Sequence, residues 1–234
     1  MLSHFRFAAV LGAASLLFTT PAFAHVAVAG PAFAGQTQVI NFSIGHGCAG
    51  ADTFRLEVAL PKEVSSVRVI PSVFGDAEIK TDDAGAALSV IWSKPAATRP
   101  QDDQFYQLAI RAKLPDAPFT TLYFPAKQSC RAADGTESVV EWAATAEEVA
   151  AAKMGEEPEP APALSILPVR FTGWNKYTTK TKIADLSVFK DAQIVWVGDA
   201  AYSSNPATAD LIKAEAGVTQ LTEIKADAEI WVKY

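Results

Sequence analysis

The residue best suited to metal chemistry is His25, because it would stand first in the chain once a leader is removed. Residues 1–24 have the pattern of a cleaved signal peptide: an apolar run from Ala8 to Phe18 precedes a small–x–small ending at Ala24. A histidine at the first position offers both its free α-amine and its ring Nδ1 to one metal ion. The reference pKa of such an amine is about 8, so a bound metal displaces its proton near neutral pH.

Nitrogen donors in a tetragonal arrangement suit Cu²⁺, which also has the highest affinity in the divalent series. This arrangement is called a histidine brace, and it exists only if processing cuts between Ala24 and His25. Two alternatives remain open: His25 is an incidental residue after the cleavage site, or residues 1–24 are an uncleaved membrane anchor. The sequence thus predicts a copper site at His25.

A second candidate ligand is His46, in the segment Gly45-His46-Gly47-Cys48. Flanking glycines let the backbone approach closely and adopt unusual angles, so a histidine there can be held at the end of a strand. The alternative is a turn histidine that is hydrogen-bonded to the backbone. Nearby Asp52 is a candidate oxygen ligand, with an ordinary loop carboxylate as the alternative.

Trp142 is the third candidate at the metal site, because an indole ring near a cation can shield it and interact through its face. Taken alone, a tryptophan at a strand end is more often part of the core. The other four tryptophans are interpreted as core or surface aromatics. Glu57 and Glu141 are interpreted as outward-facing strand residues without an assigned role.

Cys48 and Cys130 are the only cysteines in the chain. In an exported protein two cysteines usually pair, because the compartment is oxidising. A Cys-ligated copper or redox site is the alternative, but the spacing contains no CxxC pair. We therefore expect a structural disulfide between Cys48 and Cys130.

Several classes of enzyme have no support in the sequence. It contains no GxSxG, HExxH, Walker A or dinucleotide-binding motif. Only two histidines follow residue 24, which excludes a three-histidine zinc centre. The net charge is −6 and no Lys/Arg cluster stands out, so nucleic acid is not an expected partner.

Short strands are expected from Gln38 to Trp142, because apolar residues alternate with polar ones and turn residues separate the runs. About seven strands with this spacing predict a mostly β fold, an antiparallel immunoglobulin-like β-sandwich. We assign residues 25–146 to this domain. A short helix is expected between Ala144 and Met154.

The segment 147–163 is acidic and rich in proline, and it is predicted to be a semi-rigid, solvated linker. Residues 164–234 are predicted to form a small α+β domain of unknown role. Its helix should run from Pro206 to Ala216, with Asn205 as its cap and with Leu211 and Ile212 facing the core.

The sequence resembles the YcnI-like copper-binding family over about residues 25–145. The resemblance is carried by Ala24-His25-Val26 after a signal peptide and by three strands: Phe42-Ser-Ile44, Phe54-Arg-Leu-Glu-Val-Ala-Leu-Pro61 and Val140-Glu-Trp142. It implies a β-sandwich that binds copper as a chaperone or homeostasis factor. The family's site is a one-histidine brace completed by an acidic side chain and a tryptophan.

His25 and Trp142 match that pattern. Where the carboxylate is expected, this sequence has Gly45-His46-Gly47-Cys48 instead, so the third ligand is open between His46 and a carboxylate such as Asp52.

Three functions follow as hypotheses. The first is a non-enzymatic Cu²⁺-binding protein that buffers or delivers copper outside the cytoplasm, in a periplasm, with copper chaperones or membrane copper transporters as partners. The second is an envelope-associated interaction module without metal, in which residues 164–234 bind the envelope. The third is a brace-type copper monooxygenase that acts on polysaccharide.

Overall fold

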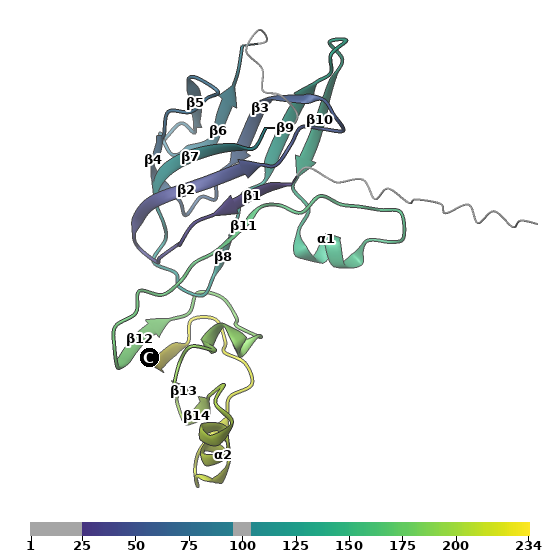
Figure 1. Cartoon of the computed structure of the whole chain (residues 1–234). Helices are drawn as coiled ribbons and strands as arrows, with labels where there is room; N and C mark the ends of the chain where they lie inside the picture. The colour runs from purple at the N-terminus through teal and green to yellow at the C-terminus, as the bar shows by residue number, and fades with distance from the viewer. Residues whose placement is uncertain (1–24, 96–103) are drawn as a thin grey trace, which may run out of the picture.

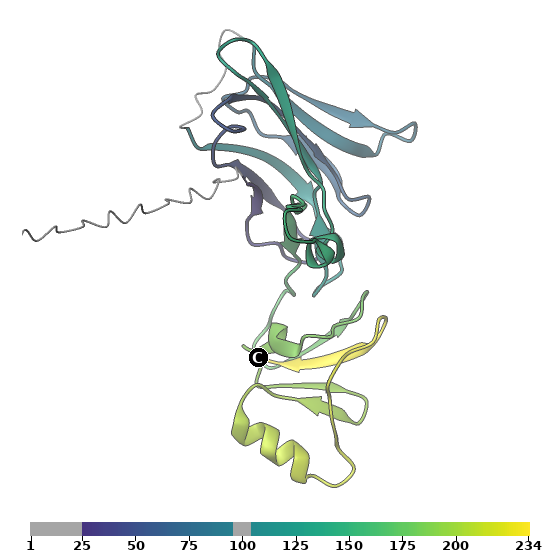
Figure 2. The same ribbon diagram turned by 90° about the vertical axis from the view of Figure 1, so that its right-hand side faces the viewer.

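The described part of the computed structural model comprises residues 25–95 and 104–234. The predicted signal peptide, residues 1–24, lies outside the described residues. Two antiparallel sheets face each other in the N-terminal part, and a smaller sheet with a helix forms the C-terminal part (Figures 1 and 2).

The first sheet of the sandwich has four strands, in the order β1-β2-β7-β4. Its neighbours are all antiparallel, and β2 and β7 pair along their whole length. The strands are β1 (Val26–Ala29), β2 (Thr37–Ile44), β7 (Tyr106–Lys113) and β4 (Ser65–Val69).

The second sheet has five strands, in the order β10-β9-β3-β6-β5, and is also antiparallel. Its strands are β10 (Glu137–Trp142), β9 (Ala126–Arg131), β3 (Asp52–Ala59), β6 (Ala87–Ser93) and β5 (Ala77–Thr81). Strands β1 and β10 are therefore edge strands of the two facing sheets.

The alternation seen in the sequence decides which residues form the core between the sheets. Along β2 and β7, every second side chain is buried: Ile40, Phe42 and Ile44 in one, and Leu108 and Ile110 in the other. In a strand, successive side chains point to opposite faces, so one apolar face is enough to build this core. The predicted antiparallel β-sandwich is confirmed.

The predicted disulfide is also confirmed: Cys48 and Cys130 are joined across 82 residues of sequence. Cys48 follows β2, whereas Cys130 lies on β9. The bond therefore links the turn after a strand of the first sheet to a position near the end of β9 in the second sheet.

The segment after β10 differs from the predicted solvated linker. Helix α1 (Ala146–Ala151) begins with a capping box between Thr145 and Glu148 and has no buried residue. Beyond it the chain returns to the sandwich: β11 (Ala163–Ser165) pairs with β8 (Thr121–Tyr123). We call residues 159–167 the strap.

The prediction that a separate domain starts at residue 164 is wrong, because Leu164 and Ile166 are buried in the sandwich core. Backbone bonds extend the attachment, since the Leu167 N–H donates to the carbonyl of Ala32 over 2.6 Å. Proline lacks an N–H, but the carbonyls and the remaining amides of a proline-rich segment still pair with a sheet edge.

After the strap the chain forms a second, smaller core around a five-stranded sheet in the order β12-β16-β13-β14-β15. The strands are β12 (Trp174–Thr178), β16 (Glu229–Lys233), β13 (Ile194–Val197), β14 (Ala200–Tyr202) and β15 (Thr219–Gln220). A short 3₁₀ helix, η2 (Leu186–Phe189), packs Phe189 into this core.

Helix α2 (Pro206–Ala214) has the predicted cap, since the Asn205 side chain accepts a hydrogen bond from the Ala207 N–H. Ile212 is buried as expected, but Leu211 is 71% exposed, so its predicted core position is wrong. Adjacent helical residues point about 100° apart, and this helix turns only one narrow stripe towards the sheet. Within the described residues, no helix has the length and apolar character to cross a membrane.

Candidate metal centre

His25 directly precedes edge strand β1, and Trp142 is the last residue of edge strand β10. Their ring centroids lie 5.4 Å apart, with 42° between the ring planes. His25 is exposed, whereas Trp142 is only 1% exposed and belongs to the sandwich core. Two residues separated by 117 positions in sequence thus meet where the edges of the two sheets come together.

His46 lies in the turn after β2, half-buried, and its Nδ1 is 2.8 Å from the carbonyl oxygen of Gly47. This is the backbone-bonded turn histidine that the sequence left open as an alternative. The same bond is compatible with metal binding, because a histidine ligand commonly directs its other ring nitrogen at a backbone carbonyl. Val26 of β1 and Ile44 of β2 form the last pair of their ladder. His25 precedes Val26 and the turn with His46 follows Ile44, so both histidines lie at the same end of this strand pair.

Gln128 is a residue that sequence reasoning missed. It is fully buried on β9, and its Oε1 accepts a hydrogen bond from the Trp142 indole N–H over 3.3 Å. Its Nε2 donates to the carbonyl of His46 and to Thr53 Oγ1. One buried amide therefore positions both the candidate tryptophan and the backbone of the candidate histidine.

The only sign of Gln128 in the sequence is its place between Ala126 and Cys130, the alternate positions that would share its face of a strand. A buried polar side chain requires partners, but its sequence position does not reveal which they are.

Glu159, in the strap, is a second residue that sequence reasoning missed. Its carbonyl accepts hydrogen bonds from the N–H groups of Ala143 and Ala144, the two residues that follow Trp142. Partial burial raises the pKa of the Glu159 carboxyl, and the nearby charge of His25 opposes that rise. The structure therefore brings a carboxylate near His25 from a segment that was predicted to be a linker.

Asp52, the carboxylate proposed from sequence, is the first residue of β3. In the register of the β3–β9 ladder it lies opposite Arg131. Within the described residues, no three His, Cys, Asp or Glu side chains gather into a metal-binding group. A histidine brace takes two nitrogen donors from one residue, so the donor chemistry of His25 with a single carboxylate or imidazole still fits Cu²⁺.

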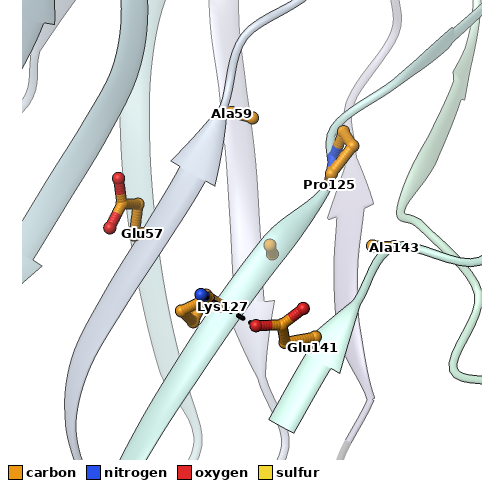
Figure 3. A pocket seen from close by; sticks show the side chains of 7 residues that line it. Glu57, Ala59, Pro125, Lys127, Glu141 and Ala143 are labelled. Atoms are coloured by element: carbon orange, nitrogen blue, oxygen red, sulfur yellow. Dashed lines mark ion pairs between the residues drawn. The ribbon is translucent and has the colours of Figure 1, made fainter. Parts of the chain in front are cut away.

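A separate hollow of about 250 Å³ lies on the outer face of β3, β9 and β10, and Figure 3 shows the side chains that line it. Its charged members are Glu57, Lys127 and Glu141. Glu141 points away from the core that holds its neighbour Trp142, as expected for adjacent strand residues. The hollow is therefore not part of the His25 site.

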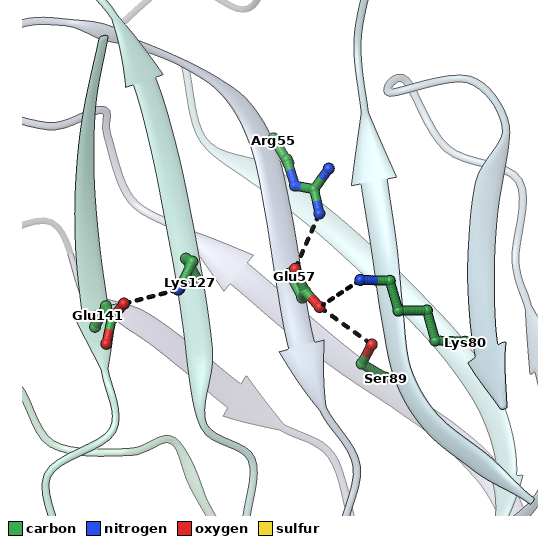
Figure 4. A network of polar contacts seen from close by, with 6 residues as sticks. All are labelled: Arg55, Glu57, Lys80, Ser89, Lys127 and Glu141. Carbon is green, nitrogen blue, oxygen red and sulfur yellow. Dashed lines mark hydrogen bonds and ion pairs between the residues drawn. The ribbon is translucent and has the colours of Figure 1, made fainter. Parts of the chain in front are cut away.

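The charges around this hollow are paired with one another (Figure 4). Glu141 contacts Lys127 over 2.8 Å, and Glu57 contacts Arg55 over 2.9 Å and Lys80 over 3.4 Å. Burial alone would raise the pKa of Glu57, but the hydrogen bond from Arg55 and the charge of Lys80 hold it below its usual value. These residues form a charged outer face, so Glu57 and Glu141 are outward-facing strand residues, as expected from the sequence.

Solved structures include one clear relative of the sandwich. An uncharacterized protein from Nocardia farcinica with an immunoglobulin-like fold is 31% identical, with a TM-score of 0.50, over 61% of this chain and 98% of that chain. The predicted immunoglobulin-like fold class is thereby confirmed. A putative membrane anchored protein from Corynebacterium diphtheriae is 11% identical, with a TM-score of 0.32, over 62% of this chain and 35% of that chain, which is too low to support an argument.

No curated protein matches the chain. The family model that matches is described as a domain of unknown function, DUF1775, and it spans residues 25–166. The match begins at His25 and ends within the strap, so it takes in the sandwich, Trp142 and Glu159. Because it covers more than half of the sequence, the chain belongs to the DUF1775 family.

Proposed function

We propose that this protein is an exported, non-enzymatic Cu²⁺-binding protein of the YcnI-like type, which buffers or delivers copper in the periplasm. The observation that carries the proposal is the contact of His25 with Trp142, at the place where the sheet edges meet. Copper chaperones or membrane copper transporters would then be its partners.

In this proposal the α-amine and the imidazole of His25 supply two nitrogen donors, and the metal is the cargo. Trp142 presents an aromatic ring beside the cation and shields it from water on the core side. Gln128 holds that ring in place through the indole N–H. The rigid sandwich thus supports a donor residue that is itself exposed and open to a partner.

The remaining donor is either Glu159 or His46. We favour Glu159, because its charge interacts with that of His25. The strap fixes its backbone to Ala143 and Ala144. A carboxylate oxygen beside two nitrogens also suits Cu²⁺. His46 would serve through its Nε2, with Nδ1 kept on the Gly47 carbonyl.

The decisive experiment compares protein that begins at His25 with protein that carries one additional residue before it. Both are titrated with Cu²⁺ and measured by electron paramagnetic resonance. We expect tight one-to-one binding with nitrogen hyperfine coupling in the first sample and its loss in the second. Equal binding by both samples would remove the amine of His25 from the site and refute the brace.

The third donor is decided by Glu159→Gln and His46→Gln in protein that begins at His25. Glu159→Gln should weaken Cu²⁺ binding at least tenfold, whereas His46→Gln should change it less than threefold. Glu147→Gln, on the exposed surface of α1, is the matched control and should leave affinity unchanged. The reverse order of effects would assign the third donor to His46.

A further inference from the structure

Three tryptophans lie on one face of the C-terminal sheet, outside the site proposed above. Trp174, Trp231 and Trp196 come from the adjacent strands β12, β16 and β13. Trp174 is 50% exposed and Trp231 is 43% exposed. Together with Gly198 they line a hollow of about 400 Å³, which is within the size range of small-ligand sites. We call this surface the indole face.

The register explains why these side chains share one face. Trp196 is paired directly with Trp231, and Trp231 with Lys176, so these three form one row across the sheet. Trp174 is paired with Lys233 in the next row on the same face. The alternate residues, Val195 and Val232, are fully buried on the opposite side, in the second core.

The indole face is held in shape by polar contacts. Lys176 Nζ lies 5.6 Å from the centre of the Trp231 ring and 2.7 Å from a Glu229 carboxylate oxygen. The hydrogen bond from Lys176 lowers the pKa of the Glu229 carboxyl, and a smaller contribution in the same direction comes from the Trp231 side chain. The Trp231 ring is therefore oriented before any ligand arrives, which reduces the entropy lost on binding.

The composition of this surface restricts what it can bind. Indole rings and Gly198 line this hollow, unlike the mixed apolar grooves that receive a peptide helix. Trp196 also borders a neighbouring hollow with the aliphatic residues Ile194 and Leu211. Two lysines, Lys176 and Lys233, alternate with the indoles and disfavour a cationic ligand of the kind that aromatic cages bind. A neutral or anionic ligand with flat apolar faces and polar edges fits the indoles, the lysine donors and the Glu229 acceptor together.

We propose that the indole face binds a glycan chain of β-1,4-linked pyranose units. The equatorial substituents of such sugars leave flat faces of C–H groups that stack on indole rings, while the hydroxyl groups at the edges hydrogen-bond to lysine and carboxylate. Neighbouring strands are about 4.8 Å apart, so three adjacent strands spread the indoles over about 10 Å. That span matches two consecutive sugar units. The inference is independent of copper binding.

The test measures binding by the whole chain from His25, in the presence of a chelator, by calorimetry and tryptophan fluorescence. The probes are chitohexaose, cellohexaose and soluble peptidoglycan glycan strands, which distinguish the sources of this shared chemistry. We expect at least one to bind and to shift the fluorescence. Trp174→Ala and Trp231→Ala should each weaken that binding tenfold or more.

Phe171→Ala is the matched control, because Phe171 is 71% exposed in the same part of the chain and does not line the hollow. It should bind within twofold of the unaltered protein. If Trp231→Ala fails to fold, Trp174→Ala decides alone, since its side chain lies half-exposed on edge strand β12.

Absence of binding to all three glycans at millimolar concentration would overturn the proposal, and so would equal binding by the tryptophan variants. Tryptophan-dependent binding to phospholipid vesicles, or tryptophan-dependent self-association in sedimentation, without glycan binding would also overturn it.

Discussion

At the scale of single residues, the site depends on a few buried polar groups that hold exposed donors in place. Trp142 is both a core residue and a neighbour of His25, so the two interpretations of this tryptophan are compatible. Gln128 allows Trp142 to have both roles, because it accepts a hydrogen bond from the indole N–H within the core. A residue without any metal-binding chemistry thus controls the geometry around a candidate ligand.

Gln128→Leu should lower the free energy of unfolding by about 2–3 kcal/mol, because it leaves the indole N–H of Trp142 and the hydroxyl of Thr53 buried without this partner. Urea denaturation measures this, and Gln107→Leu, on the exposed face of β7, should change stability by less than about 0.5 kcal/mol. Equal effects of both substitutions would show that the buried network contributes nothing specific.

At the scale of elements, the strap and the outer face of the second sheet behave differently from what their composition suggests. The strap contains two prolines and follows an acidic segment, yet it carries two core residues and pairs with β8. The outer face of the second sheet is strongly charged, yet its charges neutralise one another in pairs. The strap is held by the packing of its apolar side chains, and the charges of the outer face are paired because of the register of neighbouring strands.

Leu164→Ala should destabilise the sandwich by about 2–4 kcal/mol, because it leaves a cavity in the core where this 6% exposed side chain packs. Thermal or urea denaturation, followed by the near-ultraviolet circular dichroism of the aromatic side chains, measures the loss of stability. Leu88→Ala, where the side chain is 52% exposed, is the control. If Leu164→Ala lowers the free energy of unfolding no more than the control does, the strap contributes nothing to the core and acts as a linker.

Glu57 should contribute to stability above about pH 4.5 and lose that contribution as the pH falls through its folded-state pKa. The reason is that Arg55 and Lys80 hold this pKa below the ordinary value of 4.5, so the unfolded chain binds the proton more readily. The contribution at neutral pH is below about 1 kcal/mol, since the pairs are partly exposed.

The measurement is urea denaturation of the unaltered protein and of Glu57→Gln from pH 7 to pH 3. The difference in unfolding free energy should shrink as the pH falls below about 4.5. Glu78→Gln, at an exposed position on β5, which is separated from β3 by β6, serves as the control. A difference that grows towards low pH would contradict the assigned direction of the shift.

At the scale of the whole molecule, Phe119 connects the two cores. Phe119 lies in the loop before β8, and its N–H donates to the carbonyl of Ile166 in the strap. Its ring packs in the second core, 4.8 Å from that of Phe189 and 5.5 Å from that of Tyr177. The proposed copper site and the indole face therefore lie in parts of the molecule that are connected through this contact.

Phe119→Ala should destabilise the C-terminal part by about 1–3 kcal/mol and separate its unfolding from that of the sandwich, because a half-buried aromatic contact is removed. Differential scanning calorimetry should show two transitions, or a wider gap between them. Phe105→Ala, where the side chain is 63% exposed, should leave the profile unchanged. An unaltered profile for Phe119→Ala would show that the two cores are coupled by other contacts.

Features that depend on a local pattern of residues could be predicted from the sequence. Alternation with period two predicted the strands of the sandwich, and Asn205 before Pro206 predicted the start of α2. The presence of only two cysteines in a chain with a signal-peptide pattern predicted the disulfide between them. The position of His25 after a signal-peptide pattern raised the copper hypothesis, which stays a prediction until metal binding is measured.

Contacts between residues that are distant in sequence could not be predicted in this way. Strand order places edge strands β1 and β10 together, and this brings Trp142 and the strap carboxylate of Glu159 to His25. Register across β12, β16 and β13 gathers three tryptophans on one face. A local pattern records which face of a strand is apolar, but pairing between distant segments follows from the packing of the whole chain, and no short stretch of sequence contains it.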